Sequence, residues 1–125
     1  MFSKKKQQYI WKLCNSSFTD ENRGIAITLL KKMKAVSDVS DKDLIEQMDD
    51  FIYKFKKKYK IGTIIISRQF HQGAVEDGYY VSFSVKDSVS SFHTLTAKSL
   101  DEAYMKLCLS LFCGAKSGEY KKRGV

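Results

Sequence analysis

The fold of this chain is decided by the stretch Tyr79-Tyr-Val-Ser-Phe-Ser-Val85. Its residues alternate with a period of two, so that the face with Val81 and Phe83 is apolar and the other is largely polar, the pattern of a half-buried strand. A strand with one apolar face needs another element to cover that face. The sequence therefore predicts a sheet that is packed on one side.

The predicted cover is a helix, Ser99-Leu-Asp-Glu-Ala-Tyr-Met-Lys-Leu-Cys-Leu-Ser-Leu-Phe112, which follows another strand over residues 91–97. Ser99 and Glu102 have the spacing of a capping box, in which two residues satisfy each other's backbone N–H groups at the first turn. The capping box predicts that the helix begins directly after Ser99. One apolar stripe at helical spacing is expected to face the sheet, and it consists of Leu100, Ala103, Leu107 and Leu111.

Two short helices are predicted at the start of the chain. The first runs from Ser3 to Asn15 and carries the only tryptophan, Trp11. We interpret Trp11 as an anchor that packs this helix on the body rather than as a base-stacking residue, because aromatic side chains serve most often as core. The second helix is capped by Thr19 and ends near Lys34. Their short connection predicts a helical hairpin.

A longer helix and the first strand are predicted next. Ser40 is the expected helix cap, and apolar residues from Leu44 to Tyr59 lie on one stripe. Gly62 is expected to end this helix, and a strand follows over residues 63–70. The three successive isoleucines at 64–66 predict that this strand is central in the sheet or covered on both faces.

These elements together predict an α+β fold. An N-terminal helical hairpin and a long helix precede a three-stranded antiparallel sheet packed by a C-terminal helix, in the order α-α-α-β-β-β-α. A chain of 125 residues with 43% hydrophobic residues fits a single domain with one core. Within it we expect the hairpin at residues 1–36, an α-β-β-β-α body at residues 40–113 and a flexible basic tail at residues 114–125.

The composition predicts a cytoplasmic protein without a membrane segment. No apolar run, residues 64–66 included, approaches the roughly 20 residues of a spanning helix. Polar residues interrupt any apolar region behind Lys4, Lys5 and Lys6, so no secretory signal is predicted. Three cysteines, an odd number without metal-ligand spacing, fit a reducing compartment better than a disulfide scaffold.

Positive charge is concentrated toward the two ends of the sequence. The net charge of the chain is +8, and residues 1–60 carry 14 Lys and Arg against 8 Asp and Glu. Residues 61–112, which contain the predicted sheet, carry 4 against 5. A contact with a polyanion is therefore expected on the N-terminal helices and the C-terminal tail rather than on the sheet.

The densest basic run lies at residues 54–60 of the long helix, and it has two interpretations. Its lysines can form a face that follows a row of phosphates. Alternatively they complement the helix dipole, because acids occupy the first half of this helix, and Asp50 with Lys54 makes a favourable i,i+4 pair. Both interpretations stay open, since one helix can serve both purposes.

No catalytic or metal-binding motif is found in the sequence. Neither His71 nor His93 has a Cys, Asp or Glu at a recognised metal spacing. We interpret Cys108 and Cys113 as small buried hydrophobes, with a thiol nucleophile paired to His93 as the minor alternative. The sequence therefore predicts a protein that is not an enzyme and that carries no metal or cofactor.

Residues 41–113 have the order helix, three strands, helix, with His71 in the loop between the first two strands. In order and length this part resembles the double-stranded-RNA-binding domain, which places a histidine in the equivalent minor-groove loop. The resemblance implies a minor-groove contact by His71. That family begins its last helix with a lysine-rich segment, whereas this chain has Lys98-Ser-Leu-Asp-Glu102, whose two acids repel phosphates.

A second resemblance covers roughly residues 60–113. The small size, the absence of proline, the lysine-rich composition and the final Ser99-Leu-Asp-Glu-Ala helix resemble the small α/β sandwich proteins encoded by bacteriophages. Many proteins of that kind bind host machinery and redirect it. The resemblance implies a partner among the host proteins that handle nucleic acid.

Two classes of function are therefore predicted. In the first, the protein binds nucleic acid or a nucleic-acid-handling complex with limited sequence specificity. In the second, it is an inhibitor or adaptor that docks on a host protein through the open face of the sheet or the loop at 71–78, with Tyr80 and Phe92 as exposed anchors or as packing residues. Neither the oligomeric state nor the identity of the partner is predicted. The candidate binding residues are Lys4, Lys5, Lys6, Lys31, Lys32, Lys34, Lys54, Lys56, Lys57, Lys58, Lys60, Arg68, His71, Tyr80, Lys121, Lys122 and Arg123.

Overall fold

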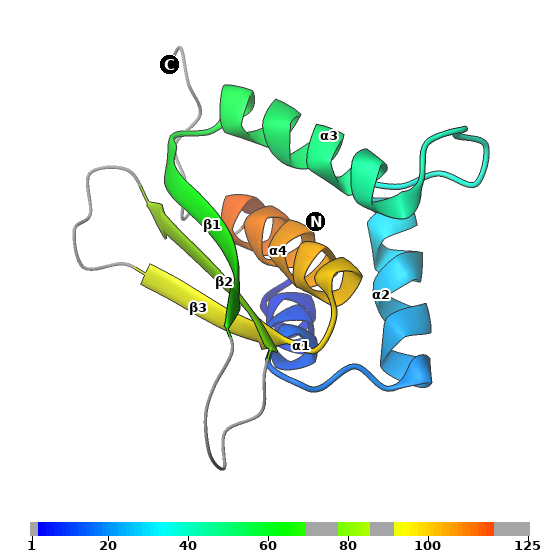
Figure 1. The fold of residues 1–125 in the computed structure, drawn as a ribbon, viewed down its shortest axis with the longest axis horizontal. Helices are drawn as coiled ribbons and strands as arrows, with labels where there is room; N and C mark the ends of the chain where they lie inside the picture. Colours follow the sequence, from blue (N-terminus) through cyan, green and yellow to red (C-terminus); the bar gives the residue numbers. More distant parts are fainter. Residues whose placement is uncertain (1–2, 70–77, 86–91, 117–125) are drawn as a thin grey trace.

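The computed structural model describes residues 3–69, 78–85 and 92–116, and these residues have the predicted α+β fold (Figure 1). The predicted order of elements is confirmed. In chain order the elements are α1 (Lys4–Cys14), α2 (Asp20–Lys32), α3 (Leu44–Lys58), β1 (Ile61–Gln69), β2 (Gly78–Val85), β3 (Phe92–Ala97) and α4 (Leu100–Lys116).

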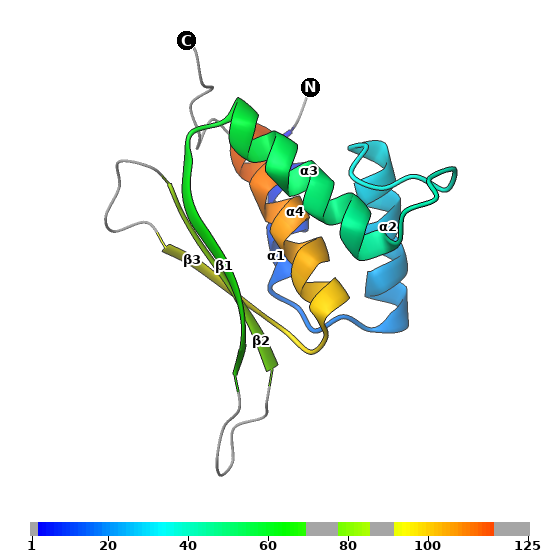
Figure 2. The ribbon, with the colours of Figure 1, turned by 45° about the horizontal axis from the view of Figure 1, so that its top comes forward.

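Helix α4 lies between the sheet and the other helices and contacts all of them (Figures 1 and 2). It begins after Ser99, whose Oγ accepts a hydrogen bond from the Glu102 N–H at 3.3 Å, as the capping box predicts. Buried residues, Met105, Leu109 and Ser110 among them, surround the helix, so that it is enclosed on nearly every side. The single stripe predicted from the sequence was too narrow, because α4 packs on helices as well as on the sheet. The prediction was also wrong for Leu100, which is 37% exposed at the start of the helix.

The C-terminal end of α4 lies beyond the predicted one. We expected the helix to end near Phe112 and a tail to begin at residue 114, whereas the helix continues to Lys116. The extra turn is held by packing against α1, because the Cys113 thiol lies 3.6 Å from the Gln7 carbonyl oxygen and Gly114 is buried.

The sheet has the strand order β1-β2-β3, and both pairs are antiparallel. Val81 and Phe83 of β2 are fully buried, which confirms the half-buried strand. The prediction that residues 64–66 form a central or doubly covered strand is wrong, because β1 is an edge strand. Ile64 and Ile66 pack on the core, whereas Ile65 is 49% exposed on the opposite face. The helices cover one face of the sheet (Figure 2).

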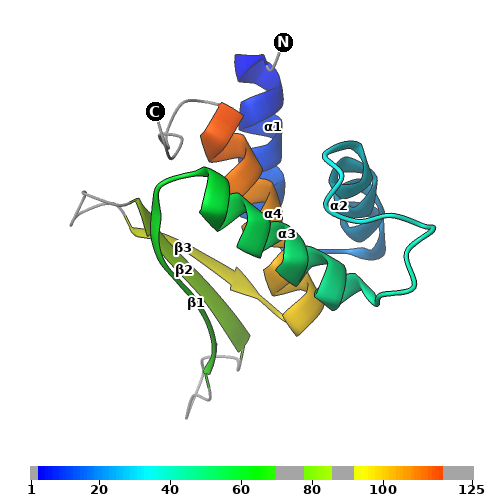
Figure 3. The same ribbon diagram turned by 90° about the horizontal axis from the view of Figure 1, so that it is seen from above.

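Helices α1 and α2 both have α4 as their main helix partner (Figure 3). Ile10 and Leu30 belong to the same hydrophobic cluster as the buried residues of β2 and α4. Trp11 is half-buried and packs against this cluster, as expected of an anchor. The first two helices and the sheet therefore share one core.

Two boundaries of α3 differ from the prediction. Asp43 caps the helix in place of Ser40, because the Asp43 carboxylate accepts a hydrogen bond from the Glu46 N–H at 2.8 Å, while Ser40 Oγ accepts one from the Lys42 N–H within the preceding turn. At the other end, Gly62 lies inside β1, where the pairing register with β2 shifts. A glycine in a strand often marks such an irregularity, so Gly62 was wrongly interpreted as the end of the helix.

Candidate nucleic-acid interface

Contacts between the helices show which of their ends are neighbours. The start of α2 lies beside the start of α4, because Arg23 forms an ion pair with Asp101. Helix α1 runs in the opposite direction to α4, since Gln7 contacts Cys113 near the end of α4 and Cys14 contacts Lys106 near its middle. The C-terminal ends of α3 and α4 lie on the same side as the N-terminal end of α1 (Figure 3), and the residues that follow α2 line a pocket with both.

Lysines from the four helices, together with Lys34 just after α2, line two pockets between these helices. A pocket of about 140 Å³ lies between α1, α2 and α4, and a second pocket of about 300 Å³ lies between the ends of α2, α3 and α4. The two pockets are neighbours, because Met33 and Phe112 line both. We define the basic end as the lysines that line the two pockets, namely Lys6, Lys32, Lys34, Lys54, Lys58 and Lys116.

The lysines of the basic end are exposed, and within the described part of the chain none of them forms an ion pair. The predicted i,i+4 pair between Asp50 and Lys54 is wrong, because the Asp50 carboxylate lies 2.5 Å from the ammonium group of Lys42. Lys42 precedes α3, and its side chain extends along the first turns of the helix to Asp50. Lys54 therefore does not pair with Asp50, and its charged group lines the pocket.

Acidic residues gather at the opposite ends of the same helices. Asp20 and Glu21 lie in the first turn of α2, Asp101 and Glu102 in that of α4, and Glu46 in that of α3. Each helix separately follows the dipole rule, with acids at its start and lysines at its end. Because α3 and α4 end on the same side and the residues after α2 line the same pocket, the rule also brings lysines together. The helix ends themselves contribute only about half a negative charge each, less than the lysines that surround them.

Lys34 is held at the rim of the larger pocket in an unusual backbone conformation. Its φ angle is 62°, the only positive value among the described residues other than glycine. Helix α2 ends there in a Schellman motif, because the Lys34 N–H donates to Lys31 O and the Ala35 N–H donates to Leu30 O at 2.9 Å. Glycine is the usual residue at this position, since a side chain there costs about 1 kcal/mol or more.

Aromatic side chains line the same pocket beneath the lysines. The rings of Phe51 and Phe55 lie 5.8 Å apart, and Phe55 stacks on Tyr59 with ring centroids 4.5 Å apart. Phe112 of α4 completes the aromatic lining. The Lys116 ammonium lies 5.5 Å from the centroid of the Phe112 ring. The pocket therefore combines a cationic rim with an aromatic wall.

Some predicted lysines lie near the basic end without lining its pockets. Lys4 and Lys5 are exposed in the first turn of α1, next to Lys6. Lys56 and Lys60 are half-buried at the end of α3 and just after it, and Lys57 lies 4.5 Å from the centroid of the exposed Tyr53 ring. Lys31 forms an ion pair with Asp38 at 2.8 Å.

Two other predicted residues lie elsewhere. Arg68, near the far end of β1, donates a hydrogen bond to the Tyr79 hydroxyl at 2.7 Å and lies over the Tyr79 ring. Tyr80 is half-buried and lines a third pocket, of about 390 Å³, at the ends of β2 and β3. Neither joins the basic end. His71, Lys121, Lys122, Arg123 and the side chain of Phe92 lie outside the described residues.

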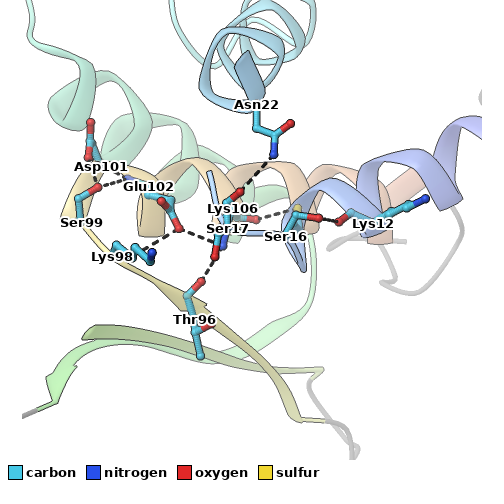
Figure 4. Close-up of polar contacts among 11 residues, drawn as sticks. Lys12, Ser16, Ser17, Asn22, Thr96, Lys98, Ser99, Asp101, Glu102 and Lys106 are labelled. Carbon is cyan, nitrogen blue, oxygen red and sulfur yellow. Dashed lines mark hydrogen bonds and ion pairs between the residues drawn. The ribbon is translucent and has the colours of Figure 1, made fainter. Parts of the chain in front are cut away.

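The third pocket contains a buried ion pair that the sequence analysis missed (Figure 4). Lys106 Nζ lies 3.0 Å from Glu102 Oε2, donates to the Thr96 carbonyl oxygen at 2.7 Å and lies 5.0 Å from the centroid of the Phe18 ring. Glu102 also accepts a hydrogen bond from the Lys98 N–H. These partners are all internal, so the pair joins α4 to β3 and to the segment before α2.

The sequence analysis also missed part of the larger pocket. Lys116 was assigned to the tail, although its i,i+4 spacing from Phe112 is compatible with one more helical turn. Phe51, Phe55 and Tyr59 were assigned to the core stripe of the long helix. Periodicity identifies such a stripe but does not show which of its residues end beside a pocket.

The three cysteines form no disulfide with one another, and all three are buried. Burial raises the pKa of Cys14 to about 11 and also raises the pKa of Cys108. A thiol with a raised pKa forms little of the reactive thiolate at neutral pH. Among the described residues, no group of three His, Cys, Asp or Glu side chains is placed to hold a metal ion.

In the described part of the chain, no helix has the length and apolar character needed to cross a membrane. Comparison of the chain with protein-family models, with curated proteins and with solved structures gives no match. The resemblances to the double-stranded-RNA-binding domain and to bacteriophage proteins therefore stay predictions. The argument for function rests on the geometry of the basic end.

Proposed function

We propose that this protein is a non-enzymatic binding protein that holds nucleic acid through the basic end, with limited sequence specificity. The observation that carries the proposal is the convergence of six exposed lysines, five from the four helices and Lys34 just after α2, which are scattered between residues 6 and 116 of the sequence. Scattered lysines would serve solubility, whereas a cluster of lysines around two pockets with no carboxylate in their described lining attracts a polyanion. Contacts from lysine ammonium groups to phosphates carry little sequence information.

A matched pair of double variants tests this proposal. Lys54→Gln/Lys58→Gln removes two charges from the basic end, and Lys12→Gln/Lys98→Gln removes two exposed charges from the last turn of α1 and the end of β3. Both variants have the same net charge. Binding of labelled single-stranded and duplex oligonucleotides of random sequence is measured by fluorescence anisotropy at about 50 mM and 200 mM salt.

The first variant is expected to bind several-fold more weakly. The slope of the logarithm of its binding constant against the logarithm of salt concentration is expected to become less steep by about 0.7 to 0.9 per lost phosphate contact. The second variant should bind like the unmodified protein. Equal effects of the two variants would mean that net charge alone governs binding. The proposal fails if the unmodified protein shows no salt-sensitive binding at the lower salt concentration.

The second candidate function is docking on a partner protein. It is favoured by the open face of the sheet, where Ile65 is 49% exposed on the edge strand β1. An exposed apolar side chain on an edge strand is a suitable anchor for a protein partner. In this case Ile65→Thr would abolish capture of the partner, while the lysine variants of the basic end would leave it unchanged.

A further inference from the structure

The larger pocket of the basic end offers two kinds of contact at once. Its volume of about 300 Å³ is at the lower limit for pockets that hold small organic ligands. Its rim carries Lys34, Lys54, Lys58 and Lys116, which come from the end of α2, from α3 and from the end of α4. A ligand in this pocket would therefore meet cations from three separate parts of the chain.

The wall of the pocket is aromatic rather than polar. Phe51, Tyr59 and Phe112 are half-buried and line the pocket, and Phe55 behind them is buried. Two of the cations lie close to rings of this wall, since Lys58 Nζ is 5.6 Å from the Tyr59 centroid and Lys116 Nζ is 5.5 Å from the Phe112 centroid. A flat aromatic group placed in the pocket would contact rings while its anionic substituents met ammonium groups.

A nucleotide has this combination of groups. We propose that the pocket holds one unpaired base of a nucleic-acid strand, and that Lys34, Lys54, Lys58 and Lys116 contact the phosphates next to that base. This inference rests on the proposed function and adds the class of nucleic acid. A base in a duplex must first leave its stack and its partner, whereas a base in a single strand is already available. The protein therefore prefers single strands to duplexes.

The test compares three nucleic acids of equal length, about 12 nucleotides, which is within the site sizes of single-strand binders. They are a single strand of mixed sequence, a strand in which the bases are replaced by abasic sites, and a duplex. The single strand is expected to bind about tenfold more tightly than the abasic strand, since stacking of one base on aromatic side chains contributes on this scale. It should also bind more tightly than the duplex.

Equal affinity for the normal and the abasic strands would overturn the inference and leave the proposed function standing. Absence of salt-sensitive binding to all three would overturn the proposed function as well. Poly-glutamate serves as an anionic probe without bases. If poly-glutamate bound as tightly as the single strand at equal charge, the basic end would bind polyanions without contacting a base, as it would in a complex with an acidic protein. The inference would then be wrong.

Variants of the pocket wall localise the contact. Tyr59→Leu and Phe112→Leu keep an apolar side chain and remove the ring, whereas Tyr53→Leu removes an exposed ring of the same helix that does not line the pocket. The first two variants should lose the preference for the normal strand over the abasic strand, and the third should keep it. The opposite pattern would place any stacking outside the pocket and overturn the inference.

A measurement on the unmodified protein avoids the risk that a wall variant fails to fold. The fluorescent base 2-aminopurine, placed in the single strand, changes its emission when it leaves its neighbouring bases and stacks on an aromatic ring. Its emission is expected to change when the protein binds and to return to its original value when salt releases the strand. Binding without any change in emission at every position of the strand would contradict the base pocket.

Discussion

Lys106 Nζ lies 3.0 Å from Glu102 Oε2, and the two side chains are 3% and 6% exposed. Removing one partner of a buried ion pair leaves a charge that is neither solvated nor paired, at a cost of about 3–5 kcal/mol. Lys106→Met is therefore expected to lower the free energy of unfolding by about this amount. Urea denaturation followed by circular dichroism measures it.

The double variant Glu102→Gln/Lys106→Met supplies the control, because it leaves no buried charge. Its loss of stability is expected to be smaller than that of Lys106→Met alone, since replacing both partners of a buried pair is often close to neutral. A double variant that is less stable than either single variant would show that the pair stabilises the fold by more than mutual neutralisation.

Alkaline pH is expected to destabilise the protein through Cys14. Burial raises the pKa of this thiol from 9.0 to about 11 in the fold. The contribution of the protonated Cys14 thiol to the free energy of unfolding is therefore fully present below about pH 9. It is lost as the pH rises toward 11, because the thiol of the unfolded chain releases its proton at a lower pH than the thiol of the folded chain. The loss amounts to at most about 3 kcal/mol.

Cys14→Ala isolates this effect from the titration of lysines and tyrosines. The difference in unfolding free energy between the unmodified protein and the variant is expected to shrink as the pH rises from about 8 to 10.5. Urea denaturation at several pH values measures it. A difference that stays constant over this range would mean that the Cys14 thiol titrates equally in the folded and unfolded states.

Acid is expected to weaken the contact between α2 and α4. Burial acts to raise the pKa of Asp101, but hydrogen bonds from Ser99 and Arg23 and the charge of Arg23 outweigh it and lower the pKa below its usual 3.8. The stabilisation is present above about pH 4 and is lost as the pH falls through the lowered pKa. Asp101→Asn should therefore cost about 0.5–1 kcal/mol at neutral pH, a small value because the pair is partly exposed.

Thermal unfolding measures this effect at neutral and at acidic pH. The unmodified protein and Asp101→Asn are expected to differ at pH 7 and to converge near pH 2. Arg23→Gln is the matched variant on the other side of the ion pair and should show the same convergence. A difference that persists in acid would assign the effect to the packing of Asp101 rather than to its charge.

Lys34→Gly is expected to stabilise the fold and to weaken binding at the same time. Glycine adopts the positive φ of 62° without strain, which should raise the free energy of unfolding by up to about 1 kcal/mol. The same change removes one cation from the rim of the larger pocket, so affinity for nucleic acid should fall several-fold. Urea denaturation and anisotropy titration measure the two effects separately.

Lys31→Ala is the control for this variant, because Lys31 lies in the last turn of the same helix but forms an ion pair with Asp38. It is expected to change affinity little. If Lys34→Gly raised stability without affecting affinity, the side chain of Lys34 would have no part in the interface.

Much of the fold could be predicted because its determinants are local. Ser99 and Thr19 mark helix starts through hydrogen bonds to N–H groups three residues later, and the alternation around Val81 and Phe83 follows from the pleat of a strand. The position of β1 could not be predicted, because an apolar run such as Ile64–Ile66 looks the same in an edge strand and in a central one.

The site could be predicted only in part, because it depends on how distant helices are oriented. The lysines at the ends of α2 and α3 were recognised, yet nothing local shows that these ends meet near Lys6 of α1 and Lys116 of α4. The choice of Lys42 over Lys54 as the partner of Asp50 likewise depends on the path of the chain before α3. Local sequence identifies the charges, and tertiary structure decides which of them act together.

Helices α3 and α4 run in similar directions (Figure 1), so that acidic residues of their first turns lie on one side and Lys54, Lys58 and Lys116 on the other. The electric field of a charged strand would orient such a molecule before contact, so that in most encounters the basic end would face the strand. Its rate of association should therefore depend strongly on salt, and its rate of dissociation much less.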